Sequence, residues 1–116
     1  MNVICHYEIP STDFDKSKAF YEGLFGWPIQ AMPEMNYMVF GEAGQGVGGG
    51  FNKVEKVNNE GIQVYIEVED IPASLTKAKE LGGEVLMDKT QISPEHGYMA
   101  FILDSCGVKV GLWSKS

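Results

Sequence analysis

This chain lacks long hydrophobic runs, and positive charge is scarce in it. No apolar stretch approaches the roughly 18 residues that a membrane-spanning helix needs. Its 9 basic residues stand against 16 acidic ones, which gives a formal net charge of -7. Because phosphate binding needs a basic patch, this balance argues against nucleic acid as the main partner. The simpler interpretation of the charge is that it only keeps the protein soluble.

Cysteine is also scarce, since the chain has only Cys5 and Cys106. Their spacing fits no disulfide framework, so we expect both thiols to be reduced, as they are in the cytosol. No basic and apolar leader is visible, and we therefore expect a cytoplasmic protein without a membrane partner. A length of 116 residues suffices for one domain with its own core.

Two segments of the chain, 4–26 and 61–83, read as copies of one unit. Each has an alternating stretch, then an aspartate, then a helical stretch that ends in glycine. The number of residues that separates Asp13 from Asp70 also separates the other matching positions of the two segments. Two copies predict a duplicated supersecondary unit, because a solenoid needs about three repeats or more.

The likeness continues beyond the helices, with slightly larger offsets. Residues 37–40 resemble 98–101, and residues 46–51 resemble 108–113. We therefore predict one domain over the whole chain, built from two modules. The predicted domain and modules cover residues 1–116, about 1–56 and about 61–116.

Alternation and capping signals predict the order βαβββ in each copy. Asp13 and Asp70 are typical N-cap residues for the two helices, the second of which should span 71–81. This order predicts an α+β fold with two small sheets and the helices outside. The predicted strands cover residues 3–9, 27–31, 36–41, 46–53, 62–68, 84–90, 98–103 and 108–113.

Alternation along the first strand of each copy also predicts which side chains share a face. Cys5 and Ile9 fall on the apolar face, so we expect Cys5 in the core under the helix. A polar strand face either lines a cavity or meets solvent, and two matching faces favour the cavity. The polar faces carry His6, Glu8, Gln63, Tyr65 and Glu67.

A series of short motifs runs along the chain in a familiar order. They are His6 before Asp13, 18–27, 48–51, 68–71, 98–101, 104–108 and 111–113. Together they resemble the vicinal oxygen chelate superfamily, which includes glyoxalases, bleomycin-resistance proteins and extradiol dioxygenases. The resemblance implies two βαβββ modules that form a partly open barrel around one site. It also implies a small-molecule ligand and, often, a homodimer.

The resemblance further implies a metal site with one ligand from the first and last strand of each module. The first-strand positions are His6 and Gln63, and both residue types could coordinate a metal. The last-strand positions fall on Gly49 and Gly111, which have no side chain. Catalytic zinc sites normally supply about three protein ligands, so we expect no tightly bound metal or other cofactor. Glu8, on the same face as His6, is the one candidate for a substitute ligand.

His6 and Glu8 are also the candidate catalytic pair. The imidazole could act as a general base beside a carboxylate, or it could be hydrogen-bonded in a polar cavity without any chemistry. Glyoxalases hold the glutathione carboxylate with an arginine four residues after the first ligand. That position is Pro10 here, which argues against glutathione chemistry.

Aromatic residues near the two glycines suggest where a ligand would lie. Phe51 and Trp113 occupy matching positions in the two copies. They predict an apolar slot for a ring, and the alternative is that both side chains belong to the core. Gln63 and Tyr65 would orient the ligand, whereas Glu67 could simply be solvated at a strand end. His96 lies in the longer loop of the second copy, where it could cover the site or lie on the surface.

The sequence therefore favours a glyoxalase-like module that binds a small, ring-bearing molecule between its modules without a complete metal site. The alternative is a metal-dependent lyase, isomerase or dioxygenase that uses His6 with an unusual ligand set. Whether the protein is an enzyme stays open at this point. The two hypotheses differ in their metal content, because only the second requires a metal.

Overall fold

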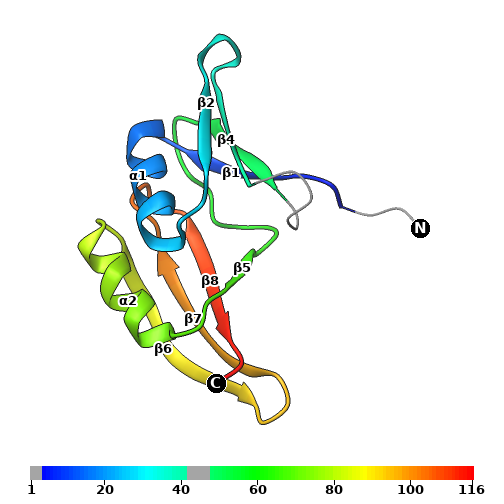
Figure 1. Cartoon of the computed structure of the whole chain (residues 1–116), viewed down its shortest axis with the longest axis vertical. Coiled ribbons are helices and arrows are strands. Elements are labelled where there is room, and N and C mark those ends of the chain that lie inside the picture. The colour runs from blue at the N-terminus through cyan, green and yellow to red at the C-terminus, as the bar shows by residue number, and fades with distance from the viewer. Residues whose placement is uncertain (1–3, 42–47) are drawn as a thin grey trace.

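The computed structural model describes residues 4–41 and 48–116, and its elements follow the predicted order βαβββ twice (Figure 1). The first module comprises β1 (Tyr7–Ser11), α1 (Phe14–Phe25), β2 (Ile29–Met32), the short 3-10 helix η1 (Pro33–Met35), β3 (Tyr37–Phe40) and β4 (Gly49–Lys53). The second module comprises β5 (Tyr65–Glu67), α2 (Ile71–Glu80), β6 (Glu84–Ser93), β7 (Gly97–Leu103) and β8 (Lys109–Ser114).

Each module forms a four-stranded mixed sheet of the same topology. The strand orders are β1-β4-β3-β2 and β5-β8-β7-β6, and the first strand of each module runs parallel to its last. Figure 1 shows α1 and α2 beside each other on one side of the molecule. The two sheets do not close into a barrel, which confirms the predicted α+β fold with a partly open barrel.

The helix starts follow from the two matching aspartates. Asp13 accepts a hydrogen bond from the backbone N–H of Lys16 at 3.2 Å, and Asp70 accepts one from Ala73 at 3.0 Å. Both carboxylates thus satisfy an N–H group that has no partner within the helix. Gly26 ends α1 in the left-handed region at φ 68°, which a residue without Cβ adopts readily.

Several strand bounds differ from the prediction, most clearly at the first strand of each module. The strand predicted at 62–68 pairs only at Tyr65–Glu67, and the one predicted at 3–9 lies at Tyr7–Ser11. The starts of the predicted strands 3–9 and 46–53 fall outside the described residues. Cys5 therefore precedes the ladder and is exposed, so the prediction that it lies in the core is wrong.

The core lies on the helix-facing side of both sheets. In the first module it is largely aromatic: the rings of Trp27 and Phe40 stack at 4.6 Å, and Tyr21 packs edge-on against Phe51 at 5.0 Å. In the second module Ile102 and Leu112 are fully buried under α2. The opposite face of the first sheet carries the exposed Glu8, and His6, also exposed, lies just before β1.

Strand register corrects the way the two modules were matched. Ile9 pairs with Phe51 in the first sheet, and its counterpart Ile66 pairs with Leu112 in the second. Phe51 therefore corresponds to Leu112 rather than to Trp113. A shift of one residue moves a side chain to the other face of a sheet. By the same register, the counterpart of Gly111 is Gly50 rather than Gly49.

A buried hydrogen-bond group joins the modules. The hydroxyl of Tyr21 on α1 donates to Asp104 Oδ2 at 2.9 Å, while the backbone N–H groups of Cys106 and Val108 donate to Oδ1 at 2.8 and 2.9 Å. Both Tyr21 and Asp104 are buried. Burial raises the pKa of Asp104 above its usual 3.8, and these hydrogen bonds offset part of that effect.

Candidate functional site

Three polar side chains meet on the open face of the first sheet. His6 Nε2 lies 2.7 Å from the Tyr37 hydroxyl oxygen, and that hydroxyl donates to Glu8 Oε2 at 3.0 Å. His6 and Glu8 stand two residues apart near the start of β1, and Tyr37 begins β3, so β4 lies between the strands that supply them. We call this group the tyrosine clamp.

The hydrogen bonds of the tyrosine clamp fix its protons. A phenol has one hydrogen, and here it is donated to the carboxylate of Glu8. The contact between His6 and Tyr37 therefore needs a hydrogen on His6 Nε2, which makes the imidazole the donor. Partial burial raises the pKa of Tyr37 above its usual 10.0, and the hydrogen bond and charge of Glu8 raise it further. The phenol thus stays protonated at neutral pH.

Glycines on the last strand of each sheet are covered by tyrosine rings. A Cβ atom built on Gly50 would collide with the ring of Tyr37. A Cβ atom built on Gly111 would lie 2.5 Å from the ring of Tyr65. Because Gly50 pairs with Glu8 and Gly111 pairs with Tyr65, the two glycines hold the same place in their sheets. The matching position is therefore Gly50 and not Gly49, whose Cβ would meet the core side chain of Phe40.

These residues do not fit the metal that the family resemblance implies. Across residues 4–41 and 48–116, no group of three or more histidine, cysteine, aspartate or glutamate side chains could hold an ion. Gly50 and Gly111 offer no ligand atom, and His6 Nε2 carries a hydrogen toward Tyr37. The side-chain amide nitrogen of Gln63 donates to the backbone oxygens of Val64 and Lys109, at 2.9 and 3.3 Å, so its amide oxygen is the one atom that it could offer an ion.

The other predicted site residues are not gathered in one place. Phe51 has no exposed surface and packs in the aromatic core beneath α1, so it cannot form one wall of a slot with Trp113. Trp113 is half-buried at the far end of β8, where its indole N–H donates to the backbone oxygen of His96 at 2.6 Å. Glu67 borders a shallow groove between the ends of α1 and α2.

A cleft between the free edges of β1 and β5 does bring both modules together. Its volume is about 370 Å³, within the range typical of ligand pockets. Among the predicted residues, Gln63 and Tyr65 line it. Its walls, as far as they come from residues 4–41 and 48–116, carry no charged side chain; these residues are Ile4, Tyr7, Ile9, Trp27, Phe40, Ile62, Gln63, Val64, Tyr65 and Ile66.

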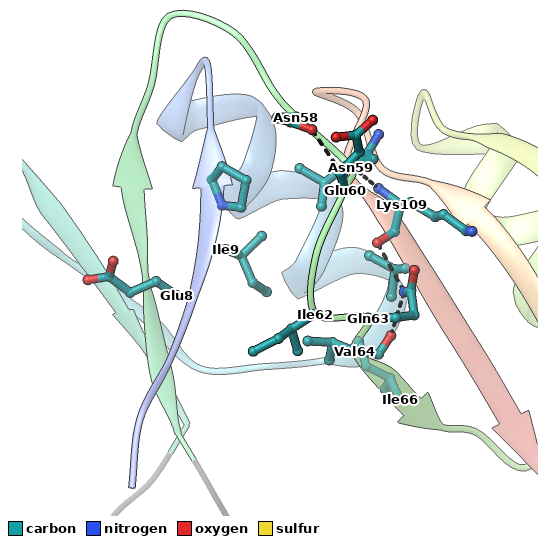
Figure 2. Close-up of a pocket in the computed structure, with 13 residues that line it drawn as sticks. Glu8, Ile9, Asn58, Asn59, Glu60, Ile62, Gln63, Val64, Ile66 and Lys109 are labelled. Carbon is teal, nitrogen blue, oxygen red and sulfur yellow. Dashed lines mark hydrogen bonds between the residues drawn. The ribbon is translucent and has the colours of Figure 1, made fainter. Parts of the chain in front are cut away.

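A second, smaller hollow continues from this cleft toward the linker between the modules (Figure 2). Its polar side is fixed in place, because Asn59 accepts from the backbone N–H of Lys109 at 2.9 Å and donates to Gly107 O at 2.8 Å. Figure 2 shows the carboxylate of Glu8 directed away from Ile62 and Gln63. Glu8 thus lines the smaller hollow but not the cleft, and the tyrosine clamp lies outside the cleft itself.

Sequence reasoning missed Tyr37 entirely. The sequence did contain a signal for this role. Tyr37 begins a strand that neighbours the glycine-rich strand, and glycine leaves room there for an aromatic ring. The role of Ile62 at the mouth of the cleft was also missed. This residue is 91% exposed. An isoleucine so exposed, next to an apolar hollow, is a typical sign of a binding surface.

Comparison with known proteins agrees with this architecture. Residues 4–41 match a family model described as bleomycin resistance protein-like N-terminal. A glyoxylase-like domain-containing protein of Didymella fabae is 31% identical over 110 residues, which cover 86% of this chain and 84% of that protein. The chain belongs to the vicinal oxygen chelate superfamily.

A second relative extends the comparison. The Mycobacterium tuberculosis protein CFP32, which carries a provisional glyoxylase name, is 29% identical over 124 residues. That match covers 91% of this chain but 43% of CFP32, so the chain spans less than half of that relative's length.

Solved structures show the same fold at low identity. A glyoxalase/bleomycin resistance protein/dioxygenase family enzyme from Burkholderia phytofirmans matches with a TM-score of 0.76 at 16% identity, over 97% of this chain and 98% of that one. A mutant of the fosfomycin resistance protein FosX from Listeria monocytogenes matches with a TM-score of 0.80 at 13% identity, over 100% and 92%. Within the described ranges, none of the helices is both long and apolar enough to cross a membrane.

Proposed function

We propose that this chain binds a ring-bearing small molecule in the cleft between its modules, without a resident metal. The observation that carries the proposal is the cleft itself, which has the volume of a ligand pocket and is lined, among the described residues, by uncharged side chains from both modules. Stacked Trp27 and Phe40 supply flat apolar surface, and Tyr7, Gln63 and Tyr65 supply the polar groups that would orient a ligand.

The energetics favour a flat, neutral ligand. Burying a ring of this size against apolar walls contributes about 2 kcal/mol or more. A charged ligand would lose its hydration without gaining a partner among the described wall residues, because these carry no charge. We therefore propose a neutral aromatic or alicyclic molecule with a polar substituent, held in the cytoplasm by a protein that needs no cofactor.

We also propose that the protein is a homodimer. The open faces of both sheets, together with exposed apolar side chains outside the cleft such as Leu86, at 49%, and Ile92, at 44%, leave surface that a two-fold partner would cover. Light scattering at micromolar concentration should give twice the mass of the chain, and a monomer would contradict this part of the proposal.

The cleft can be tested with N-phenyl-1-naphthylamine, a neutral fluorophore that brightens in apolar surroundings. In a Trp113→Phe background the only tryptophan is Trp27, which lines the cleft and the groove beside Glu67, so energy transfer reports a probe bound near Trp27 and the variants decide whether it lies in the cleft. Ile62→Asp places a charge at the mouth of the cleft and should weaken binding by about tenfold or more. Met35→Asp is the matched control, because Met35 is 63% exposed and does not line the cleft.

The outcomes separate clearly. Saturable energy transfer that Ile62→Asp weakens and Met35→Asp leaves within about twofold supports the cleft. Equal loss in both variants would mean that the probe follows general surface hydrophobicity, and absence of transfer would mean that this cleft takes no ring. Either result would overturn the proposed binding site.

The runner-up is a metal-dependent lyase, isomerase or dioxygenase. One observation favours it: two potential ligands, His6 and Glu8, converge on one atom. Elemental analysis of the purified protein decides between the two functions. About one zinc, nickel or iron per chain, lost in His6→Ala, would replace the binding proposal with the enzymatic one. We expect no such metal.

A further inference from the structure

Two side chains that could bind a cation point at the same atom. His6 Nε2 and Glu8 Oε2 lie 2.7 and 3.0 Å from the hydroxyl oxygen of Tyr37. Imidazole nitrogen and carboxylate oxygen are common ligands of divalent transition metals, which they bind at about 2.0–2.2 Å. The phenol oxygen therefore stands at the point where these two ligands would converge on an ion.

We propose that Tyr37 takes the place of a metal in this protein: its hydroxyl occupies the point at which His6 and Glu8 would bind a divalent cation, and so keeps the chain free of metal. This inference rests on the metal-free part of the proposed function and names the residue responsible for it. Tyr37 would thus be the residue that excludes a metal, and His6 and Glu8 would be positioning residues for its hydroxyl.

The first part of the argument is the hydrogen bonding. A metal needs the lone pair of an imidazole nitrogen, but Nε2 carries a hydrogen as long as it donates to Tyr37. The same phenol engages Oε2 of Glu8. A cation would have to displace one neutral hydroxyl that satisfies two ligands at once. Losing both hydrogen bonds opposes binding of the ion.

The second part is steric and concerns the ring rather than the hydroxyl. The ring of Tyr37 lies over Gly50, which leaves no room for a side chain on the strand that would supply a third ligand. The second module repeats this arrangement independently, because the ring of Tyr65 lies over Gly111. A tyrosine thus closes the matching position in both sheets, although the two rings come from different strands, β3 and β5.

The hydroxyl and the ring can be separated by mutation. Tyr37→Phe removes only the hydroxyl and should free His6 Nε2, so that Ni²⁺ binds at least about threefold tighter than to the wild type. Gly50→Glu alone should gain nothing, because the ring still fills the space. Gly50→Glu combined with Tyr37→Ala supplies three ligands and should bind Ni²⁺ at least about tenfold tighter again.

Isothermal titration with Ni²⁺ alone measures these affinities, and circular dichroism confirms that each variant is folded. Tyr65→Phe is the matched control, since it also removes a hydroxyl from a partly exposed tyrosine and should leave Ni²⁺ affinity within about twofold. Adding His6→Ala to Tyr37→Phe should abolish the gain. Nitrogen NMR of the wild type should show the hydrogen of the neutral His6 ring on Nε2.

The inference and the proposed function can fail separately. If the wild type takes up N-phenyl-1-naphthylamine but Tyr37→Phe gains no Ni²⁺ affinity, the role of Tyr37 is refuted and the cleft proposal stands. If the wild type itself binds Ni²⁺ as tightly as Tyr37→Phe, the hydroxyl does not exclude the ion, and the inference is overturned. If the wild type is purified with stoichiometric metal, the metal-free part of the proposed function fails as well.

Discussion

Removing one buried hydroxyl with Tyr21→Phe should loosen the joint between the two modules. Tyr21 belongs to α1 of the first module, and its hydroxyl donates to Asp104, which begins the turn between β7 and β8. The phenylalanine ring would keep the packing against Trp27 and Phe51, so the change isolates the hydrogen bond.

The size of the effect follows from burial. Asp104 is only 3% exposed, so water cannot replace the lost donor. A hydrogen bond to a charged group contributes about 1.5–3 kcal/mol, and an unsatisfied buried group costs a similar amount. We expect the free energy of unfolding at pH 7 to fall by about 2 kcal/mol. For a domain of this size the melting temperature should drop by about 6–12 °C.

The effect should also depend on pH. The pKa of Asp104 in the folded protein is raised by burial, and Tyr21 is one of the groups that lower it, so Tyr21→Phe should raise this pKa further. A raised folded-state pKa means that stability is fully present below the unfolded value of 3.8 and is lost as pH rises through the folded value. Acidification should therefore help the variant more than the wild type, and their difference should shrink toward about 1 kcal/mol below pH 3.8.

Urea unfolding of both proteins between pH 3 and 7, followed by circular dichroism, measures this difference. Tyr37→Phe is the control, because it removes the same hydroxyl from a hydrogen bond to a carboxylate, Glu8, in an exposed place. That loss should cost less than about 1 kcal/mol at any pH in the range. A difference for Tyr21→Phe below about 0.5 kcal/mol at pH 7, or one that grows on acidification, would refute the reasoning.

Further predictions concern glycine, capping and the aromatic residue on β8. Gly49→Ala should lower stability by about 3 kcal/mol or more, because its Cβ would meet a fixed backbone oxygen, whereas Gly111→Ala meets the ring of Tyr65, which must shift, and should cost about 1–2 kcal/mol by urea unfolding. Asp70→Ala should cost about 1 kcal/mol through the lost N-cap. Trp113→Ala should leave binding of N-phenyl-1-naphthylamine, measured by its own fluorescence, within about twofold, because this residue does not line the cleft.

The duplicated fold could be predicted because its signals are local. An aspartate at the N-cap and glycines at the helix ends act on their own turn, so the order βαβββ and both helices were visible in the sequence. The predicted face of Cys5 failed for a different reason. Alternation assigns a face to a residue, but only pairing decides where the strand begins, and β1 first pairs with β4 at Tyr7.

The candidate site was harder to predict, because it depends on register between strands far apart in the sequence. The sequence comparison matched Phe51 with Trp113, whereas the ladders match it with Leu112. That one-residue difference placed Phe51 on the open face, although it lies in the core. No local pattern reports such a shift, because a loop can gain or lose one residue without changing the strands it connects.

Register also explains why Gly50 and Gly111 do more in the structure than leave out a metal ligand. From the sequence, glycine at a last-strand position means only that a ligand atom is missing. In the folded chain, Gly50 and Gly111 each lie under a tyrosine ring, so glycine is needed there to admit the ring. The absence of a metal ligand and the presence of an aromatic cover are therefore one feature of the sheet. For this reason, restoring a ligand at Gly50 without removing Tyr37 should fail, and the double variant provides the decisive test of the site.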